Sequence, residues 1–317
     1  MLLLLPGAAR AAWQRASSAH FVIYADGSER LIRRFAERLE RYHAAMAYVT
    51  DVDLEQPSPS NRVTVYVVGS GKDVRRLYGE GSRYVGGFYI PRAVGSVAII
   101  PHIRDDNAFS QVVLLHEYAH HFMLTASSFP MPRWLGEGSA EFMAASRFDS
   151  KGGVDIGRGA WYRAGELVYP GAIRDVTATE LLESVKRDPN RRDSFYGKSW
   201  LLYHYLTFDK ARAGQLVRYI RLLAQGKSSL DAGLEAFGDL DVLNRDLDKY
   251  LYAPGLYLRL PGDRLEPGPV TVERLGAGAA AMMPVRIRSE RGVKPEQAQE
   301  ILDEARAVAV RYPDDPA

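Results

Sequence analysis

The sequence predicts an α+β fold in which a small mixed sheet with helices is followed by a mostly helical part. Three observations predict it. Short runs rich in β-branched and aromatic residues alternate with helical periodicity over the first 100 residues. A long apolar segment at 112–123, VVLLHEYAHHFM, then contains three of the seven histidines. Beyond residue 159, apolar residues recur mainly at helical spacing.

In chain order, the first expected element is a strand at 20–26, where HFVIYAD ends in a turn signal. Apolar residues at helical spacing predict a helix over 28–50, with Ser28 as its cap. The next expected elements are a loop at 56–61, a strand at 62–68, a short helix at 71–79 and a hairpin of 86–90 with 96–100.

Two further helices are expected to carry the polar residues of the centre of the chain. The first opens at Asn107 and is broken near Pro130, and the second runs from about 134 to 146. The later expected helices cover 178–187, 194–208, 211–225, 228–237 and 240–251, with an amphipathic helix from 294 to about 312.

The composition limits the classes of partner and site. The chain has 317 residues and a formal net charge of +2, which indicates no nucleic-acid partner and no anionic membrane partner. It has no cysteine, so a metal site would have to use histidine and carboxylates. Past the N-terminus no apolar run reaches the roughly 18 residues of a membrane span.

Four parts are expected along the chain. Residues 1–12, with apolar Leu2–Leu5, predict the remnant of a leader and an exported protein, periplasmic or extracellular. A frayed terminal segment of a cytoplasmic protein is the alternative. The other expected parts are an α/β subdomain at 13–150, a helical subdomain at 151–255, and a Pro- and Gly-rich linker with a helical tail at 256–317.

The histidine segment predicts a metal centre. His116 and His120 are four residues apart, so on a helix their rings lie on one face and can meet one tetrahedral ion. Glu117 is offset by about 100°, which suits a general base better than a ligand. The pattern is H-E-x-x-H. On the next expected helix Glu137 and Glu141 again share a face.

The order of these motifs resembles the gluzincin family of zinc peptidases, the thermolysin and aminopeptidase-N group. The shared motifs are H-E-x-x-H and W-L-x-E-G-x-A-E-F in RWLGEGSAEF, with sixteen residues between His120 and Glu137. The resemblance implies a zincin-like catalytic domain with one Zn²⁺ per chain, held by His116, His120 and Glu137. It further implies that Glu141 orients His116.

A weaker match lies in SFYGKSWLLYHYL, which resembles the Tyr-x-Lys-Gly segment of aminopeptidase-N-like enzymes. It implies that Tyr196 donates to the oxyanion, although Ser199 stands where that family has Gly. The segments HFVIYADGSERLIRRFAERLERYHAAM, GGFYI and FGDLDVLNRDLDKYL carry a further likeness. Through them, about residues 18 to 255 resemble bacterial peptidase-MA-like metallohydrolases with tetratricopeptide-like tails. That resemblance implies a protein partner at the tail. The turn chemistry after residue 312 favours a chain that is part of a longer protein.

The expected function is a zinc metallopeptidase acting on a peptide or protein substrate. The gluzincin resemblance implies that SVAII is the strand that pairs with an extended substrate. GGFYI lacks the carboxylate with which aminopeptidase-N-like enzymes bind the free amine, which favours an endopeptidase. Two alternatives stay open, a zinc hydrolase of a non-peptide amide or ester and a non-catalytic scaffold with a vestigial metal site. At residue level, Glu141 could form a plain ion pair and Tyr196 could be a packing aromatic.

Overall fold

The computed structural model describes residues 13–52, 55–79, 85–92, 95–101, 109–168, 175–183, 193–253 and 255–315. The chain forms two compact units. Unit 1 comprises 1–44, 55–114 and 266–317, and unit 2 comprises 45–54 and 115–265. Residues 266–317 thus belong to the same unit as the first part of the chain. The predicted divisions at residues 150 and 255 stay a prediction. The predicted leader and Asn107 lie outside the described residues.

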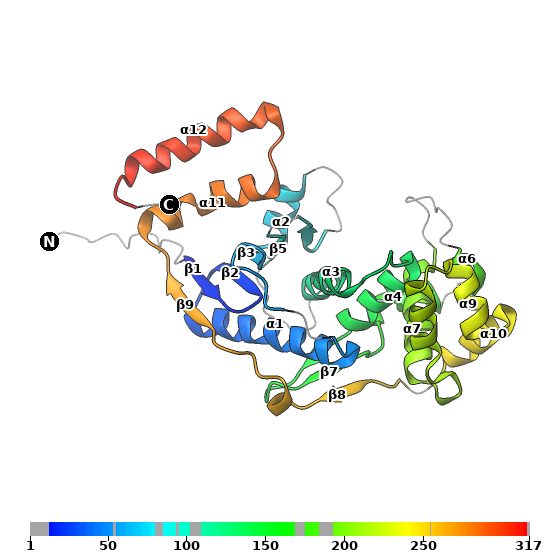
Figure 1. The fold of residues 1–317 in the computed structure, drawn as a ribbon. Coiled ribbons are helices and arrows are strands. Elements are labelled where there is room, and N and C mark those ends of the chain that lie inside the picture. The colour runs from blue at the N-terminus through cyan, green and yellow to red at the C-terminus, as the bar shows by residue number, and fades with distance from the viewer. Residues whose placement is uncertain are drawn as a thin grey trace. The chain divides into compact units, whose positions relative to one another are not determined.

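Unit 1 is built on a mixed sheet, which confirms the predicted α+β class (Figure 1). Its strands, in sheet order, are β4 (Phe88–Ile90), β5 (Val97–Pro101), β3 (Val63–Val68), β2 (Phe21–Asp26), β1 (Trp13–Ser17) and β9 (Thr271–Arg274). The pairs β2–β3 and β3–β5 are parallel, and the others are antiparallel. The predicted hairpin is the antiparallel β4–β5 pair. The expectation that SVAII pairs with a substrate is wrong for this strand, because β5 is already paired with β4 on one side and β3 on the other. β1 and β9 were not predicted.

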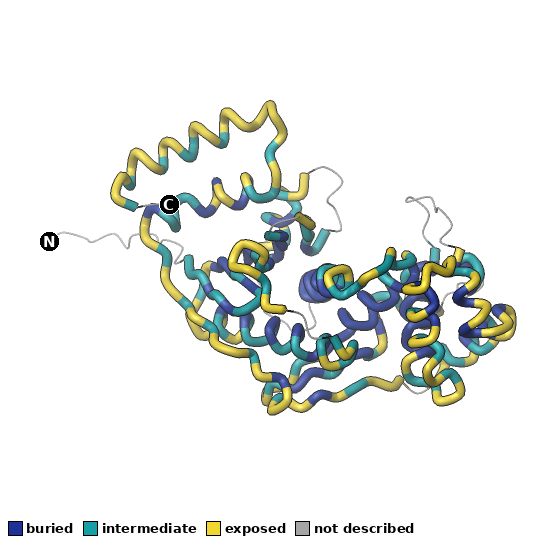
Figure 2. Tube along the Cα trace, in the orientation of Figure 1, coloured by how far each residue is buried: buried dark blue, intermediate teal, exposed yellow. Residues whose placement is uncertain are grey.

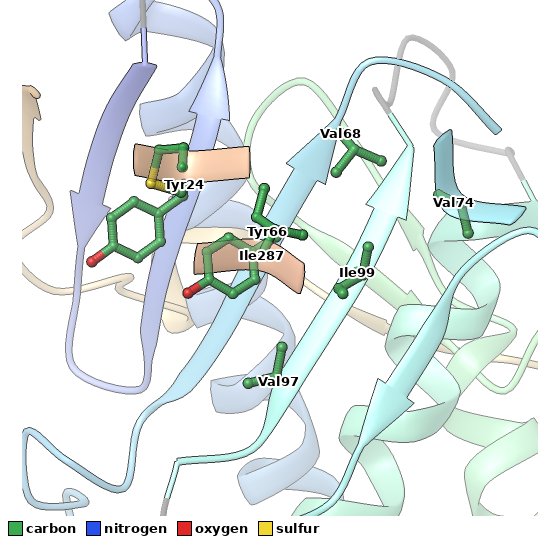
Figure 3. Close-up of a cluster of buried hydrophobic side chains, with 8 residues drawn as sticks. Tyr24, Tyr66, Val68, Val74, Val97, Ile99 and Ile287 are labelled. Carbon is green, nitrogen blue, oxygen red and sulfur yellow. The ribbon is translucent and has the colours of Figure 1, made fainter. Parts of the chain in front are cut away.

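Alternate residues of the central strands bury both faces of this sheet, as strand periodicity requires. On one face Tyr24, Tyr66 and Ile99 form a cluster with Val74 of α2 (Gly71–Tyr78) and Ile287 of α11 (Ala277–Arg291), shown in Figure 3. The alternate residues, which point to the other face of the sheet, are also buried; they include Phe21, Ile23, Val65 and Ile100. On this side α1 (Glu29–Thr50) is tied to the sheet by Glu40, whose carboxylate accepts from the backbone N–H of His20 at 2.8 Å.

The last part of unit 1 is a pair of helices, α11 and α12 (Pro295–Arg311). α12 confirms the predicted amphipathic helix, but α11 was missed because its region was expected to be a linker. An ion pair between Arg288 and Glu304 joins the two helices. Nη1 of Arg288 donates to Oε1 of Glu304 at 3.1 Å, and Nη2 pairs with Oε2. No residue of α12 is fully buried, and Figure 2 shows it mostly exposed.

Unit 2 is mostly helical, as predicted for the second half. Its longer helices are α4 (Arg133–Ala144), α7 (Phe195–Phe208), α8 (Gln215–Ala224), α9 (Ser229–Phe237) and α10 (Leu240–Tyr250). Shorter elements are η1 (Trp161–Arg163), α5 (Ala164–Leu167), α6 (Ala178–Leu182) and the small antiparallel sheet of β6 (Arg147–Phe148), β7 (Val154–Ile156) and β8 (Leu258–Leu260). The predicted helix at 178–187 corresponds to α6, which ends at Leu182. Residues 184–187 of the predicted range lie outside the described residues.

The helices α4 and α7 pack at unusually close range, and this contact fixes the helix that carries two of the candidate site residues. A Cβ on Gly138 would lie 2.5 Å from the backbone oxygen of Ser199, which no real side chain tolerates. Glycine in mid-helix normally costs about 0.5–1 kcal/mol relative to alanine, so here it is retained for packing.

Among the described residues, no helix is both long enough and apolar enough to cross a membrane.

Candidate metal centre

The first element of the candidate site is α3 (Phe109–Ala126), whose residues from 115 onward belong to unit 2. Leu115, Ala119 and Phe122 are buried along one face of this helix. His116 and His120 lie on another face, with 15% and 26% of their side chains exposed. Their ring centroids are 4.7 Å apart and the rings are nearly perpendicular. The four-residue spacing therefore brings the two imidazoles together, as the sequence predicted.

The second element is α4, which begins directly after Pro132, whose carbonyl accepts the first helical hydrogen bonds. Trp134 anchors the helix because its ring is fully buried and its indole N–H donates to the Tyr219 hydroxyl at 2.9 Å. One turn on, the side chain of Glu137 is 17% exposed, and that of Glu141, a further turn on, is 1% exposed. Both carboxylates face α3.

Three ligand atoms converge between these helices. The Nε2 atoms of His116 and His120 are 3.1 Å apart, and Oε2 of Glu137 lies 3.2 Å from the His120 atom and 3.4 Å from the His116 atom. A tetrahedral zinc ion with bonds of about 2.0–2.1 Å would hold its ligand atoms about 3.3–3.4 Å apart. The three atoms thus form a nearly equilateral triangle of the size that zinc requires. Within the described ranges this is the one group of three or more such residues that could hold a metal.

The electrostatics of the triangle favour a cation at its centre. Burial would raise the pKa of Glu137, but hydrogen bonds and positive charge from His116 and His120 lower it to about 2, so the carboxylate is ionised at neutral pH. Burial lowers the pKa of His116, yet the nearby carboxylates outweigh burial and raise it above its usual value. The site thus attracts positive charge, which a bound proton or a metal ion can supply.

Glu117, the predicted base, lies on α3 next to the first histidine and is half-buried. It is not one of the three converging residues. It is close enough to His116 to contribute to the raised pKa of that ring. A carboxylate that is near the ligand triangle but not part of it can exchange protons with a group bound there.

Glu141 approaches His116 from behind the triangle. Its Oε1 lies 3.4 Å from Nδ1 of His116, the ring nitrogen opposite the converging Nε2. The same oxygen accepts two bonds from Arg163, from Nε at 3.0 Å and from Nη2 at 2.5 Å. Arg163 also donates through Nη1 to Glu166 at 2.8 Å. Glu141 therefore combines the predicted contact to His116 with an ion pair to an arginine that was not predicted.

Tyr196 lies in the first turn of α7 and contacts two arginines. The Arg163 guanidinium carbon is 4.7 Å from the centre of its ring, and the Arg133 carbon is 5.7 Å from it. Nη2 of Arg133 donates to the Tyr196 hydroxyl at 3.4 Å. Its ring also packs edge-on against Phe195, with ring centroids 5.8 Å apart. The phenol is thus connected to Glu141 and His116 through Arg163.

Sequence reasoning missed Arg163 and Glu166, which lie on η1 and α5. Their spacing of three residues is a weak signal for a local ion pair, but nothing in it indicates Glu141, which is 22 residues away from Arg163. His204 is buried, and both of its ring nitrogens have partners: Nδ1 pairs with the Tyr250 hydroxyl at 2.9 Å and Nε2 with the Gly157 carbonyl at 3.0 Å.

Comparison with known proteins adds no family assignment. No family model matches the chain, and no curated protein matches its sequence significantly. The gluzincin resemblance therefore rests on the motif residues themselves.

Proposed function

We propose that this chain is a zinc-dependent metallopeptidase that hydrolyses internal peptide bonds. The observation that carries the proposal is the triangle of His116, His120 and Glu137 atoms, with edges of 3.1–3.4 Å. Two imidazoles and one carboxylate are the donor set of catalytic zinc sites, which leave a fourth position open. The absence of cysteine from the sequence also disfavours a closed structural zinc site, which commonly uses thiolates.

When bound, zinc would supply a Lewis acid that polarises a substrate carbonyl and makes water more acidic. The protein side of the reaction belongs to Glu117. Its carboxylate would accept the proton of the attacking water as the new C–O bond forms at the carbonyl carbon. The same carboxyl group would then give that proton to the leaving nitrogen as the C–N bond breaks. Glu141 would hold His116 with Nε2 toward the ion by accepting from its Nδ1–H.

Tyr196 would donate a hydrogen bond to the carbonyl oxygen as negative charge develops on it. The contact with Arg133 supports this role, because a phenol oxygen that accepts from a guanidinium keeps its own hydrogen free for another acceptor. The two nearby guanidinium groups also favour negative charge at this position.

The proposal is tested by digesting a proteome-derived peptide library with zinc-loaded protein. We expect cuts inside peptides, without a requirement for a free terminus. Cleavage of small amide or ester probes but of no peptide would favour a non-peptide hydrolase. No hydrolysis of any substrate by fully zinc-loaded protein would favour a non-catalytic scaffold.

Protein purified without added metal should contain about one zinc per chain, because the triangle provides three ligand atoms for a single ion. His120→Ala should lose most of this zinc, since two ligands hold the ion far more weakly than three. Elemental analysis after gel filtration measures both. His204→Gln is the control, because that histidine is bonded to Tyr250 and Gly157 elsewhere in the unit. A full equivalent of zinc in His120→Ala would contradict the ligand assignment.

Tyr196→Phe should lower kcat by about 10²-fold, at the lower end of the effect of an oxyanion donor, because the ion shares the developing charge. Zinc content should stay near the parent value because Tyr196 is not one of the three converging residues. KM should also change little, because the hydrogen bond would strengthen mainly as charge develops in the transition state. Steady-state kinetics on one library-derived peptide measures this. A parent-like kcat would show that Tyr196 is a packing aromatic.

A further inference from the structure

Arg163 is the centre of a chain of polar contacts that leaves the candidate metal site and reaches α7. Toward the site, Nε and Nη2 donate to Oε1 of Glu141, the oxygen nearest Nδ1 of His116. Away from it, Nη1 donates to Oε1 of Glu166 at 2.8 Å. The other Glu166 oxygen accepts the backbone N–H of Gly197 at 3.0 Å. One guanidinium thus bridges two carboxylates from different elements.

The position of the Glu141 carboxylate depends on this arginine. Its side chain is only 1% exposed, and an ionised carboxylate at such depth is costly without a charged partner. Arg163 supplies that partner with two N–H groups on one oxygen, which restricts both the place and the orientation of the carboxylate. The other oxygen, Oε2, is buried and accepts no hydrogen bond from the described residues. Arg163 therefore determines which oxygen faces His116.

The same guanidinium also contacts the first turn of α7. It packs over the Tyr196 ring, and its partner Glu166 bonds to the next residue, Gly197. A Cβ on Gly197 would lie 2.9 Å from Leu167 and 3.2 Å from the Glu166 carboxylate, so a larger residue here would displace these two side chains. The α5 segment and the α7 turn are thus held together around Arg163.

We propose that Arg163 is a positioning residue that holds the carboxylate behind His116 and the Tyr196 turn in one fixed arrangement. It acts on zinc affinity through Glu141, and on turnover also through Tyr196. The second effect rests on the proposed peptidase function, whereas the first requires only that the triangle binds zinc.

The test measures the zinc dissociation constant of the full chain by chelator competition. Arg163→Ala should bind zinc about 10- to 100-fold more weakly, the usual cost of losing a group that orients a metal-bound histidine. Arg163→Lys should lie between the parent and Arg163→Ala, because one ammonium cannot provide the fork that bridges two carboxylates. Full recovery of affinity by Arg163→Lys would overturn the bridging role.

Arg158→Ala is the matched control for a merely structural arginine. The Arg158 side chain is 26% exposed, against 27% for Arg163, and it likewise pairs with a carboxylate, Asp155, and lies over a tyrosine ring, that of Tyr257. Both alanine variants should lower the stability of the zinc-free protein, measured by urea unfolding. Arg158→Ala alone should keep the parent zinc affinity. Equal weakening of zinc by both variants, or parent-like affinity in Arg163→Ala, would overturn the proposal.

A double variant tests the route through Glu141. If Arg163 acts on the metal by holding that carboxylate, Glu141→Ala with Arg163→Ala should bind zinc no more weakly than Glu141→Ala alone. Additive losses would show that Arg163 acts by another route and would overturn the assignment. Parent protein that binds zinc but cleaves no peptide would end the proposed function, while these zinc measurements would still decide the role of Arg163.

Discussion

Glu117→Gln protein should keep its zinc and its fold while kcat falls by about 10²- to 10⁴-fold, the usual contribution of a positioned general base. Glutamine has nearly the shape of glutamate but cannot accept a proton at neutral pH. Glu117 is not among the three residues whose atoms converge, so its replacement leaves the triangle intact. KM should change little, because the loss falls on the transition state.

The measurement pairs steady-state kinetics with zinc content and thermal unfolding of the same samples. Glu183→Gln is a suitable control, because Glu183 follows α6 and contributes no ligand to the triangle. Activity of Glu117→Gln equal to that of the parent would remove this residue from the mechanism. Loss of zinc in Glu117→Gln would instead mean that Glu117 supports the ligands directly.

The sequence predicted the central elements of the fold because their signals are local. Strands such as β3, VTVYVV, and helices such as α1 carry strong periodicity within one window. β1 and β9 were missed because each is short and partly exposed, and each depends on pairing with other strands: β1 lies between β2 and β9, and β9 pairs with β1 at the edge of the sheet. Helix α11 was missed because Gly278 and Pro284 weaken its local signal, while Met283 and Ile287 gain their stability from packing on the sheet.

The same distinction between local signals and tertiary packing applies to the residues of the candidate site. His116 and His120 were placed by helical spacing, and the structure brings both to Glu137 of the second helix. Arg163 could not be placed from the sequence, because its contact with Glu141 depends on how η1 folds back over α4. Spacing within one helix is readable from sequence, whereas a contact between distant segments depends on the tertiary packing that brings them together.

Of the two carboxylates of α4, Glu137 should contribute far more to zinc affinity than Glu141. Glu137→Ala should abolish stoichiometric zinc binding, because the Glu137 oxygen lies 3.2 and 3.4 Å from the two histidine nitrogens and completes the triangle. Its pKa of about 2 keeps it ionised wherever zinc binding is measured. Glu141→Ala should weaken zinc only about 10- to 100-fold, because its oxygen contacts the far nitrogen of His116 and not the converging atoms.

Glu141→Ala should also lower the free energy of unfolding, because it leaves Arg163 without its buried partner. The effect on zinc affinity must therefore be measured apart from this loss of stability. Glu40→Ala serves as the control. Glu40 is likewise a buried carboxylate paired to a histidine ring, His20 at 2.7 Å, but it lies in unit 1 and contributes no ligand. It should lower the free energy of unfolding without changing zinc affinity. If Glu141→Ala abolishes zinc while Glu137→Ala only weakens it, the ligand assignment is wrong by one helical turn.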